Sequence, residues 1–253
     1  MKDLPAPAPG WAFFLDVDGT LLEHAEHPQA VHVDAELIDL LAQLLEATGG
    51  AVALISGRSV EDIGRLFAPL VFPVAGQHGT ERRSADGVLH RHAPPLEQLG
   101  RAAAELVRLT AQHSGLVLEN KGMTLALHYR KAPELAGLAA REMHALVDRL
   151  GDEFELQTGK LVYEIKPSGK NKGSAIAEFM AEAPFKARLP VFIGDDLTDE
   201  LGFQVTNKLG GHSIKVGGGV TRARHSLPDQ AAVHAWLRGY LERCPPRGAR
   251  AAR

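Results

Sequence analysis

Short apolar runs separated by helical patterns are the feature of this sequence that most restricts its fold. The runs WAFFL, AVALI and LPVFI lack the polar alternation of a half-exposed strand, as expected for strands that are covered on both faces. Strands are therefore expected at 11–15, 51–55, 72–75, 189–193 and 212–216, with helices over 34–47, from Ser59, over 172–182, after Asp196 and over 229–242. Such an alternation predicts an α/β fold with a doubly wound parallel sheet.

The middle of the chain has a different pattern, in which pairs of short strands alternate with single helices. Residues 80–92 have the alternation of two strands about an Ala-Asp-Gly turn, and 153–167 form a hairpin about Thr-Gly-Lys. Between them we expect a helix over 95–112, strands near 115–119 and 123–130, and a helix over 134–150. This order predicts an open sheet with helices on one face. The expected organisation is a Rossmann-like core made of 1–79 and 166–253, with an α+β cap domain inserted at 80–165.

Charge and composition restrict the partners. The 253 residues carry a formal net charge of −3, so no basic field is available to attract nucleic acid or an anionic membrane surface. The one cysteine, Cys244, cannot form an internal disulfide. No run approaches the ~18 continuous apolar residues of a membrane helix, and the first residues lack the apolar core of a signal peptide. We therefore expect a cytoplasmic protein with neither nucleic acid nor membrane as a partner.

Polar side chains follow the expected core strands at the points where the strands end. They are Asp16 and Asp18 after the first strand, Ser56, Gly57 and Arg58 after the second, Lys172 at the start of a helix, and Asp195, Asp196 and Asp199 after VFI at 191–193. Ligands of open parallel sheets bind at the carboxyl ends of the strands. These side chains are therefore expected to meet at one edge of the sheet.

The grouping of carboxylates with a lysine and a serine fits phosphoryl transfer. Several carboxylates in one crevice repel one another, so a hard cation with oxygen ligands is implied, and Mg²⁺ is the expected ion. When a cation neutralises the substrate, a carboxylate can attack phosphorus. Asp18, brought round by a turn at Gly19, can act as general acid, while the Ser56 hydroxyl and the Lys172 ammonium can bind phosphoryl oxygens. The backbone amides of Gly19 and Thr20 can add donors to the same cradle.

Each motif has a simpler interpretation when it is taken alone. Asp-x-Asp-Gly is common in turns and in calcium loops, although no third ligand or terminal Glu stands at the spacing that a calcium loop needs. Ser-Gly-Arg is usually a turn and helix cap, Asn-Lys-Gly is usually an N-cap with a solvated lysine, and GDDLTDE suits a helix N-terminus. The four motifs together favour the catalytic interpretation, because all of them fall at strand ends, in one order and with complementary roles.

These residues also carry a family resemblance. DVDGTL (16–21), SGR (56–58), NKG (171–173) and GDDLTDE (194–200) resemble the four ordered motifs of the haloacid dehalogenase superfamily of phosphatases. The insert between the second and third motifs resembles the larger class of cap domain in that superfamily. Over nearly its full length the chain is similar to the trehalose-6-phosphate phosphatase family, through GQHGTERR (76–83), LENKGMTLALHYR (118–130), LVYEIKPSGKNKG (161–173) and GGHSIKVG (210–217).

The resemblance implies a role for each matching residue. Asp16 would be the nucleophile that forms an aspartyl-phosphate, and Asp18 the general acid and then the base for the attacking water. Mg²⁺ would be held by Asp16, the backbone carbonyl of Asp18 and Asp195, with Asp196 or Asp199 in support, and Asp199 would also orient Lys172. The residues implied in substrate binding are the cap residues Glu119, Lys121 and Glu164, which match the family's sugar-binding positions, and Gln77, His78 and Gly79, at the hinge facing the cleft. Glu81 and Arg130 are weaker candidates. Gly19, Thr20, Gly57 and Arg58 complete the expected substrate contacts.

The cap residues agree with this interpretation on physical grounds, without singling out one sugar. Glu119 and Lys121 lie two apart on an expected strand and so share one face. Two carboxylates and an ammonium can bind sugar hydroxyls through charge-assisted hydrogen bonds, whereas the alternative is a solvated Glu-Lys surface. His128 is expected to pack or hydrogen-bond within the cap sheet.

The leading hypothesis is a Mg²⁺-dependent phosphatase of trehalose biosynthesis, which converts trehalose 6-phosphate, a small-molecule sugar phosphate, into trehalose and phosphate. Two alternatives stay open. One is a phosphatase of another sugar phosphate, such as sucrose phosphate or mannosyl-phosphoglycerate, and the other is a catalytically silent sugar-phosphate-binding module. Asp18 favours an enzyme, because binding alone needs no proton donor. A functional pairing with a trehalose-6-phosphate synthase would fit the leading hypothesis.

Overall fold

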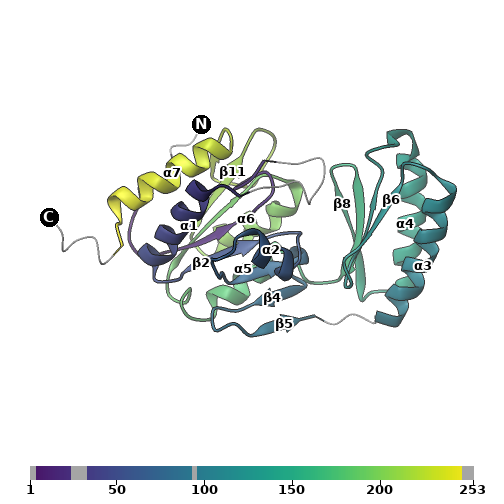
Figure 1. Cartoon of the computed structure of the whole chain (residues 1–253), viewed down its shortest axis with the longest axis horizontal. Coiled ribbons are helices and arrows are strands. Elements are labelled where there is room, and N and C mark those ends of the chain that lie inside the picture. The colour runs from purple at the N-terminus through teal and green to yellow at the C-terminus, as the bar shows by residue number, and fades with distance from the viewer. Residues whose placement is uncertain (1–3, 24–32, 93–95, 247–253) are drawn as a thin grey trace. The chain divides into compact units, whose positions relative to one another are not determined.

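The structure, a computed structural model, describes residues 4–23, 33–92 and 96–246 (Figure 1). The chain divides into two compact units, one made of Met1–His90 with Asn171–Arg253 and the other of Arg91–Lys170. We call them the core and the cap. Among the described residues, no helix has the length and apolar character needed to cross a membrane.

The core is built on one eight-stranded sheet with the order β12-β11-β10-β1-β2-β3-β4-β5. Its strands are β1 (Trp11–Leu15), β2 (Val52–Ile55), β3 (Val74–Gly76), β4 (Glu81–Arg83), β5 (Leu89–Arg91), β10 (Leu189–Gly194), β11 (His212–Val216) and β12 (His225–Leu227). Neighbouring strands from β12 to β3 run parallel, and β4 pairs antiparallel with β3. The chain builds outward from β1 on one side and from β10 on the other, so the strand order reverses between them. Ligands of doubly wound sheets bind at this switch point.

Helices cover both faces of the core sheet, which explains why apolar and polar residues do not alternate along its strands. The helices are α1 (Ala35–Thr48), α2 (Val60–Leu66), α5 (Lys172–Met180), α6 (Glu200–Lys208) and α7 (Gln230–Arg243). Phe13 of β1 packs in one cluster with residues of α1, α2 and α7. Phe14 faces the other way and packs against Phe179 of α5, with ring centroids 6.1 Å apart. Both strand residues are fully buried, which stabilises the fold by about 1.5–3 kcal/mol each.

The helix starts follow from capping side chains that the sequence carries. Asp34 accepts a hydrogen bond from the Leu37 N–H at 2.7 Å, and Ser59 accepts one from the Asp62 N–H at 3.0 Å. At the start of α5, Asn171 is the N-cap of a reciprocal capping box, which sets Lys172 in the first turn of the helix. The predicted helix starts at 34 and at Ser59 are confirmed.

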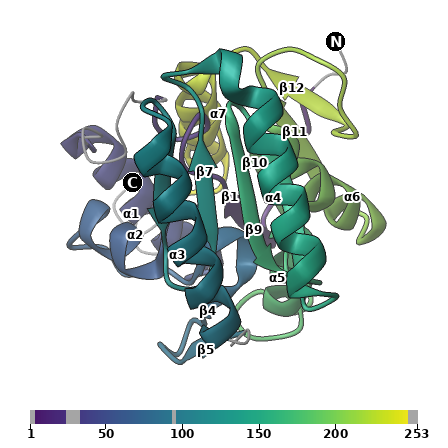
Figure 2. The same ribbon diagram turned by 90° about the vertical axis from the view of Figure 1, so that its right-hand side faces the viewer.

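The cap contains a four-stranded antiparallel sheet, the cap sheet, with helices on one face. Its strands β6 (Val117–Asn120), β7 (Leu125–His128), β8 (Phe154–Gly159) and β9 (Val162–Pro167) have the order β6-β7-β9-β8. Figure 2 shows α3 (Leu96–Gln112) and α4 (Ala136–Leu150) lying over the sheet. Leu125, Leu127 and Ile165 pack with residues of these helices. The remaining short elements are the 3₁₀ turns η2 (Gln77–Gly79), η3 (Pro133–Leu135) and η4 (Leu197–Asp199).

The predicted fold class, a doubly wound parallel sheet with a separate α+β cap, is confirmed, but the strands expected at 80–92 lie in the core sheet. β4 pairs with β3 through Gly76 and Glu81, and the boundary between the units falls after His90. Arg82 of β4 is buried and forms ion pairs with Glu178 at 3.0 Å and Glu182 at 2.5 Å. A polar alternation identifies a strand but not the sheet that it joins, and the ion pairs of the buried Arg82 cannot be predicted from sequence spacing.

Candidate active site

Asp16 and Asp195 mark the switch point of the core sheet. Asp16 directly follows β1 and Asp195 directly follows β10, and Leu15 is paired with Ile193 in the register of these strands. The Asp16 N–H donates to the Ile193 carbonyl at 3.0 Å. Because the two strands are neighbours at the centre of a buried sheet, they hold both carboxylates on a rigid support.

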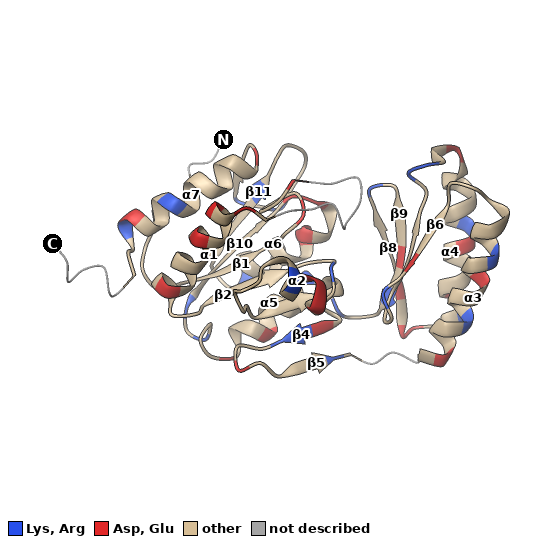
Figure 3. Cartoon of the chain, viewed as in Figure 1, with Lys and Arg blue, Asp and Glu red and all other residues tan. Residues whose placement is uncertain are grey.

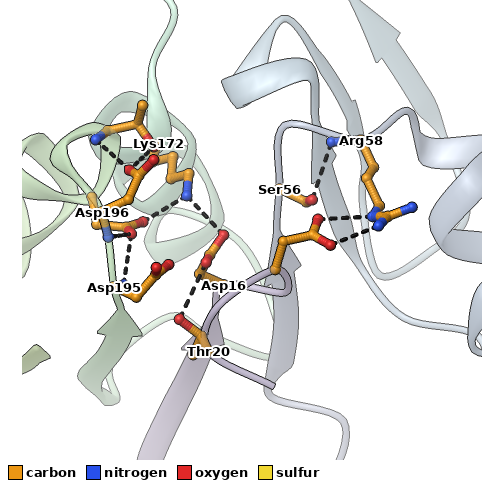
Figure 4. Close-up of polar contacts among 10 residues, drawn as sticks. Asp16, Thr20, Ser56, Arg58, Lys172, Asp195 and Asp196 are labelled. Carbon is orange, nitrogen blue, oxygen red and sulfur yellow. Dashed lines mark hydrogen bonds and ion pairs between the residues drawn. The ribbon is translucent and has the colours of Figure 1, made fainter. Parts of the chain in front are cut away.

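Lys172 links two carboxylates at this edge (Figure 4). Its Nζ atom lies 2.7 Å from Asp16 Oδ1 and 2.6 Å from Asp199 Oδ1, and its side chain is 3% exposed. Burial alone would lower the pKa of Lys172, but the negative charges of Asp16 and Asp199 outweigh it and raise the pKa. The ammonium therefore stays charged inside the site.

Burial has the opposite consequence for the carboxylates. It raises the pKa of Asp16 well above its usual value, and repulsion from Asp199 and Asp195 adds to this while Lys172 opposes it. Burial likewise raises the pKa of Asp199 against the attraction of Lys172. One lysine lies between two buried carboxylates, so a further positive charge beside Asp16 would stabilise its ionised form.

Three carboxylates form a group that can hold such a cation. Oxygen atoms of Asp16, Asp195 and Asp199 lie within 4.8 Å of one another. Carboxylate oxygens are the donors that Mg²⁺ prefers, so the donor set fits this ion. Asp199 Oδ2 also accepts the N–H groups of Asp195 and Asp196, each at 2.9 Å, while its Oδ1 accepts from Lys172. Asp199 thus has three protein donors, whereas Asp16 accepts one hydrogen bond at each oxygen, from Lys172 and Thr20, so Asp199 suits a supporting role at the cation.

The loop after β10 turns sharply around Asp199. A Cβ atom on Gly194 would lie 2.4 Å from Asp199 Cγ, so a glycine is required where the aspartate folds back under the strand. Asp196 Oδ1 accepts hydrogen bonds from the Thr198 N–H at 2.6 Å and from the Thr198 hydroxyl at 2.7 Å. Asp196, expected among the cation ligands, therefore caps η4 and lies outside the three-carboxylate group.

Asp18 is held by Arg58 in a bidentate ion pair. Arg58 Nε lies 2.8 Å from Asp18 Oδ2 and Arg58 Nη2 lies 2.6 Å from Asp18 Oδ1. The Arg58 N–H also donates to Ser56 Oγ at 3.1 Å. The loops after β1 and β2 are thereby joined. Sequence spacing gives no signal for this pair, because its members belong to separate motifs 40 residues apart.

The predicted turn at Gly19 is present, but its amides are used within the turn. Gly19 has a φ of 88°, and its N–H donates to the Leu22 carbonyl at 2.7 Å. The Thr20 N–H faces the Val17 carbonyl at 3.4 Å. The expected phosphoryl donors are thus directed into the turn and not toward a ligand. Thr20 contributes instead through its hydroxyl, which donates to Asp16 Oδ2 at 3.2 Å and orients that carboxylate.

The turn η2 lies beside the loop after β2 and is strained. Gln77 and His78 have φ angles of 46° and 56°, in the left-handed region that residues with side chains rarely adopt, and Gly79, with a φ of 103°, follows them. The first two N–H groups of η2 donate to the carbonyls of Arg58 and Ser56, each at 2.9 Å. The ring of His78 lies against Gly57, where a Cβ atom would be 2.8 Å from it. Strain of this kind persists only where the surroundings enforce it, which is common at functional sites.

The expected sugar-binding residues share one face of the cap sheet. In the strand register Glu119 lies opposite Ala126, and Ala126 opposite Glu164. Cross-strand neighbours share a face, and the alternate residues Leu125 and Leu127 pack with the helices. The face with Glu119 and Glu164, which we call the open face, is therefore the one that α3 and α4 do not cover. Charges of both signs lie on the strands of this sheet (Figure 3).

Hydrogen bonds join the side chains of the open face in two groups. Lys121 Nζ lies 3.1 Å from Glu164 Oε1, and the Thr124 hydroxyl donates to the same oxygen at 2.8 Å. Glu119 Oε2 lies 2.9 Å from His128 Nε2, so the predicted hydrogen bond of His128 within the cap sheet is confirmed. Sequence analysis did not identify Thr124, which lies just before β7; its place three residues after Lys121 in the same turn is a signal that could have identified it.

Two weaker candidates lie apart from these groups. Glu81 is buried and its Oε1 accepts the Val60 N–H at 2.6 Å, so it stabilises the start of α2. Arg130 follows β7 and is exposed, outside the two hydrogen-bonded groups of the open face.

The chain is similar to known proteins of one family. A family model described as trehalose-phosphatase matches residues 14–229. The trehalose-6-phosphate phosphatase of Escherichia coli (strain K12) is 45% identical over 241 residues, which cover 94% of this chain and 89% of that protein. A solved trehalose-6-phosphate phosphatase related protein has a TM-score of 0.75 at 26% identity, over 90% of this chain and 95% of that chain. A phosphatase of the haloalkanoate (HAD) superfamily from Bacteroides thetaiotaomicron shares the fold, with a TM-score of 0.62 at 16% identity over 92% and 95% of the two chains.

Proposed function

This chain belongs to the trehalose-phosphatase family of phosphatases, and from that premise we propose that it hydrolyses trehalose 6-phosphate to trehalose and inorganic phosphate with Mg²⁺ as cofactor. The observation that carries the chemistry is the buried Lys172, which bridges Asp16 and Asp199 while Asp195 lies within reach of a shared cation. Charges held in place before the reaction are what phosphoryl transfer requires of a protein.

Asp16 is the proposed nucleophile. Its carboxylate oxygen attacks phosphorus, a P–O bond to Asp16 forms, and the bond between phosphorus and the sugar oxygen breaks. Thr20 and Lys172 hold the two carboxylate oxygens of Asp16, at 3.2 Å and 2.7 Å. Mg²⁺ held by Asp16 and Asp195 would neutralise the phosphoryl charge that otherwise repels an attacking carboxylate.

Asp18 is the proposed proton carrier. In its protonated form it gives a proton to the leaving sugar oxygen, and as a carboxylate it then takes a proton from the water that attacks the aspartyl-phosphate. The P–O bond to Asp16 breaks in this second step and inorganic phosphate leaves. Because Arg58 holds the Asp18 carboxylate, the substrate phosphate must first draw the guanidinium away. Arg58 and the Ser56 hydroxyl would then bind phosphoryl oxygens.

The open face of the cap sheet is the proposed sugar-binding surface. Glu119, Lys121 and Glu164 offer two carboxylates and an ammonium, which suit the vicinal hydroxyls of a sugar. The E. coli relative carries the name trehalose-6-phosphate phosphatase and matches this chain through the cap as well as the core, which favours trehalose 6-phosphate over sucrose phosphate or mannosyl-phosphoglycerate.

Phosphate release from a panel of sugar phosphates tests this function. We expect trehalose 6-phosphate to be hydrolysed at least about tenfold more efficiently than sucrose phosphate or mannosyl-phosphoglycerate, a difference that one or two lost hydroxyl contacts would produce. Chelation of Mg²⁺ should abolish turnover, and added Mg²⁺ should restore it. Equal rates on sucrose phosphate would contradict the substrate assignment. Binding of the sugar phosphate without turnover would favour a silent binding module.

We propose further that the enzyme acts in the cytoplasm together with a trehalose-6-phosphate synthase. The sugar phosphate that it consumes has to be formed by an enzyme of that class. Cell fractionation tests the location, and loss of the enzyme should cause trehalose 6-phosphate to accumulate only while the synthase is active.

A further inference from the structure

Glu119 and His128 form a pair on the open face. His128 of β7 lies opposite Val117, which stands two residues before Glu119 on β6, so the two side chains are diagonal cross-strand neighbours. His128 Nε2 and Glu119 Oε2 are 2.9 Å apart, and the side chains are 36% and 39% exposed. The pair is accessible to a ligand without being fully solvated.

The chemistry of the pair assigns its proton. An ionised carboxylate only accepts hydrogen bonds, so the donor is the Nε2–H of His128. This hydrogen bond is the main cause of the lowered pKa of Glu119, although burial acts in the opposite direction. In the described part of the chain, Glu119 Oε1 accepts no hydrogen bond. One carboxylate oxygen is thus held by His128, and the other is left for a ligand hydroxyl.

Glu164 on the same face is anchored in a different way. Its Oε1 accepts from both Lys121 and Thr124, so two donors fix its position. Among the residues that the structure describes, His128 is the one donor that anchors Glu119 in a comparable way. A glutamate side chain has several rotatable bonds, and freezing them costs entropy at the moment of binding unless a neighbour has already done so. Loss of His128 should therefore affect Glu119 and leave Glu164 in place.

We propose that His128 is a positioning residue, which fixes the Glu119 carboxylate so that its second oxygen accepts a hydroxyl of the sugar. This inference rests on the sugar-binding role of the open face in the proposed function. It assigns His128 no contact with the phosphoryl group, so its effect belongs to substrate binding and not to the chemical step.

Two substitutions of His128 distinguish the effect of losing the hydrogen bond to Glu119 from the effect of losing the imidazole ring. The amide nitrogen of glutamine reaches about as far as Nε2, whereas that of asparagine falls short of Glu119. In His128→Asn, KM for trehalose 6-phosphate should rise about tenfold with kcat nearly unchanged, equal to about 1.4 kcal/mol of lost binding. His128→Gln should restore most of the loss. Hydrolysis of p-nitrophenyl phosphate, which has no sugar, should not change in either variant.

A double-mutant cycle with Glu119→Ala tests whether the effect runs through Glu119. In the Glu119→Ala background, His128→Asn should raise KM no further. An equal rise with and without Glu119 would overturn the proposal, and so would a glutamine variant no better than the asparagine variant. Circular dichroism and thermal melting check the fold, and His128→Thr, which suits a strand, replaces His128→Asn if that variant is unfolded.

The activity of the wild-type protein on the panel of sugar phosphates distinguishes a failure of the proposed function from a failure of this inference. If it hydrolyses a different sugar phosphate from the panel, the substrate assignment fails and the same cycle is measured with that sugar phosphate. If it hydrolyses none, the cycle is measured as the dissociation constant of trehalose 6-phosphate by calorimetry. Additive effects of His128→Asn and Glu119→Ala would overturn the positioning role in each case.

Discussion

The edge of the core sheet where Asp16, Lys172 and Asp199 meet, which we call the core edge, combines acidic and basic side chains, and so does the open face of the cap sheet. The two regions differ in how far these side chains are exposed to solvent. At the core edge, the side chains of Lys172, Asp16 and Asp199 are 3%, 5% and 0% exposed. On the open face, Glu119 and His128 are 39% and 36% exposed, while Glu164 and its partner Lys121 are 7% and 18% exposed, so only part of this face is as buried as the core edge. Charges interact more strongly away from water, and a buried charge depends fully on its partners. The core edge therefore suits chemistry, while the open face suits recognition of hydroxyls that arrive from solvent.

The topology of each sheet explains this difference. In the core, both faces of a parallel sheet are covered by helices, so its functional groups gather at the ends of the strands. In the cap, helices cover one face of an antiparallel sheet, so the other face can present side chains along the strands. We expect substitutions at the core edge to remove activity outright and substitutions on the open face to weaken binding by degrees.

Replacement of the proposed nucleophile should have the largest effect. Asp16→Asn keeps the shape of the side chain but removes the attacking carboxylate, so turnover of trehalose 6-phosphate should fall by about 10⁴-fold or more. Phosphate release measures the rate. Asp148→Asn makes the same change at an exposed position of α4 and should leave the rate unaltered. An Asp16→Asn variant within about tenfold of wild type would remove Asp16 from the nucleophile role.

Removal of the bridging lysine should reduce both rate and stability. Lys172→Met leaves the buried carboxylates of Asp16 and Asp199 without the ammonium group between them. We therefore expect turnover to fall about 10²–10³-fold and the free energy of unfolding to fall by about 3 kcal/mol. Arg149→Met is the matched control, because it breaks an exposed pair with Glu105 and should cost less than about 1 kcal/mol. Urea denaturation measures both variants. Equal losses would contradict the contrast between buried and exposed charge.

A substitution on the open face should change binding alone. Glu164→Gln keeps the shape but removes the negative charge that pairs with Lys121. KM for trehalose 6-phosphate should rise about tenfold with kcat within about twofold of wild type, because the contact is made equally in the ground state and the transition state. Steady-state kinetics test this. A fall in kcat as large as the rise in KM would place Glu164 in the chemical step.

The smallest expected effect is a pH dependence of stability in the cap. The His128 hydrogen bond lowers the pKa of Glu119 in the folded protein, so its stabilisation is present above the usual glutamate pKa and is lost as pH falls through the lowered value. The difference in unfolding free energy between wild type and Glu119→Gln should be under about 1 kcal/mol near about pH 7 and disappear near about pH 3. Lys121 and Glu164, which face the same carboxylate, are unchanged in both proteins. Urea denaturation at the two pH values would contradict this account if the difference stayed constant.

The elements that local chemistry decides are the ones that the sequence predicts correctly. The apolar run of β1, the Ser59 cap and the polar residues at strand ends all follow from short-range patterns, and the structure brings Asp16, Lys172 and Asp195 to one edge. The same holds for Glu119 and Glu164, which the strand period places on one face of the cap sheet.

Long-range partners could not be predicted in this way. The pairing of Asp18 with Arg58 depends on how two loops of the folded sheet meet, which residue spacing does not report. The left-handed backbone at His78 occurs at a non-glycine residue, so its sequence carries no signal of it. A polar strand looks alike in either sheet, so the sequence predicts β4 in the cap, whereas its pairing with β3 and the ion pair of the buried Arg82 with Glu178 of α5 show that it belongs to the core.

The central claim is that the core edge performs the chemistry and the open face selects the sugar. The most direct test is kcat/KM of the Glu119→Ala, Glu164→Gln double variant on trehalose 6-phosphate and on p-nitrophenyl phosphate. We predict a fall of about 100-fold on the sugar phosphate and a change of less than about twofold on p-nitrophenyl phosphate. Equal falls on both substrates, or no fall on either, would contradict this division of roles.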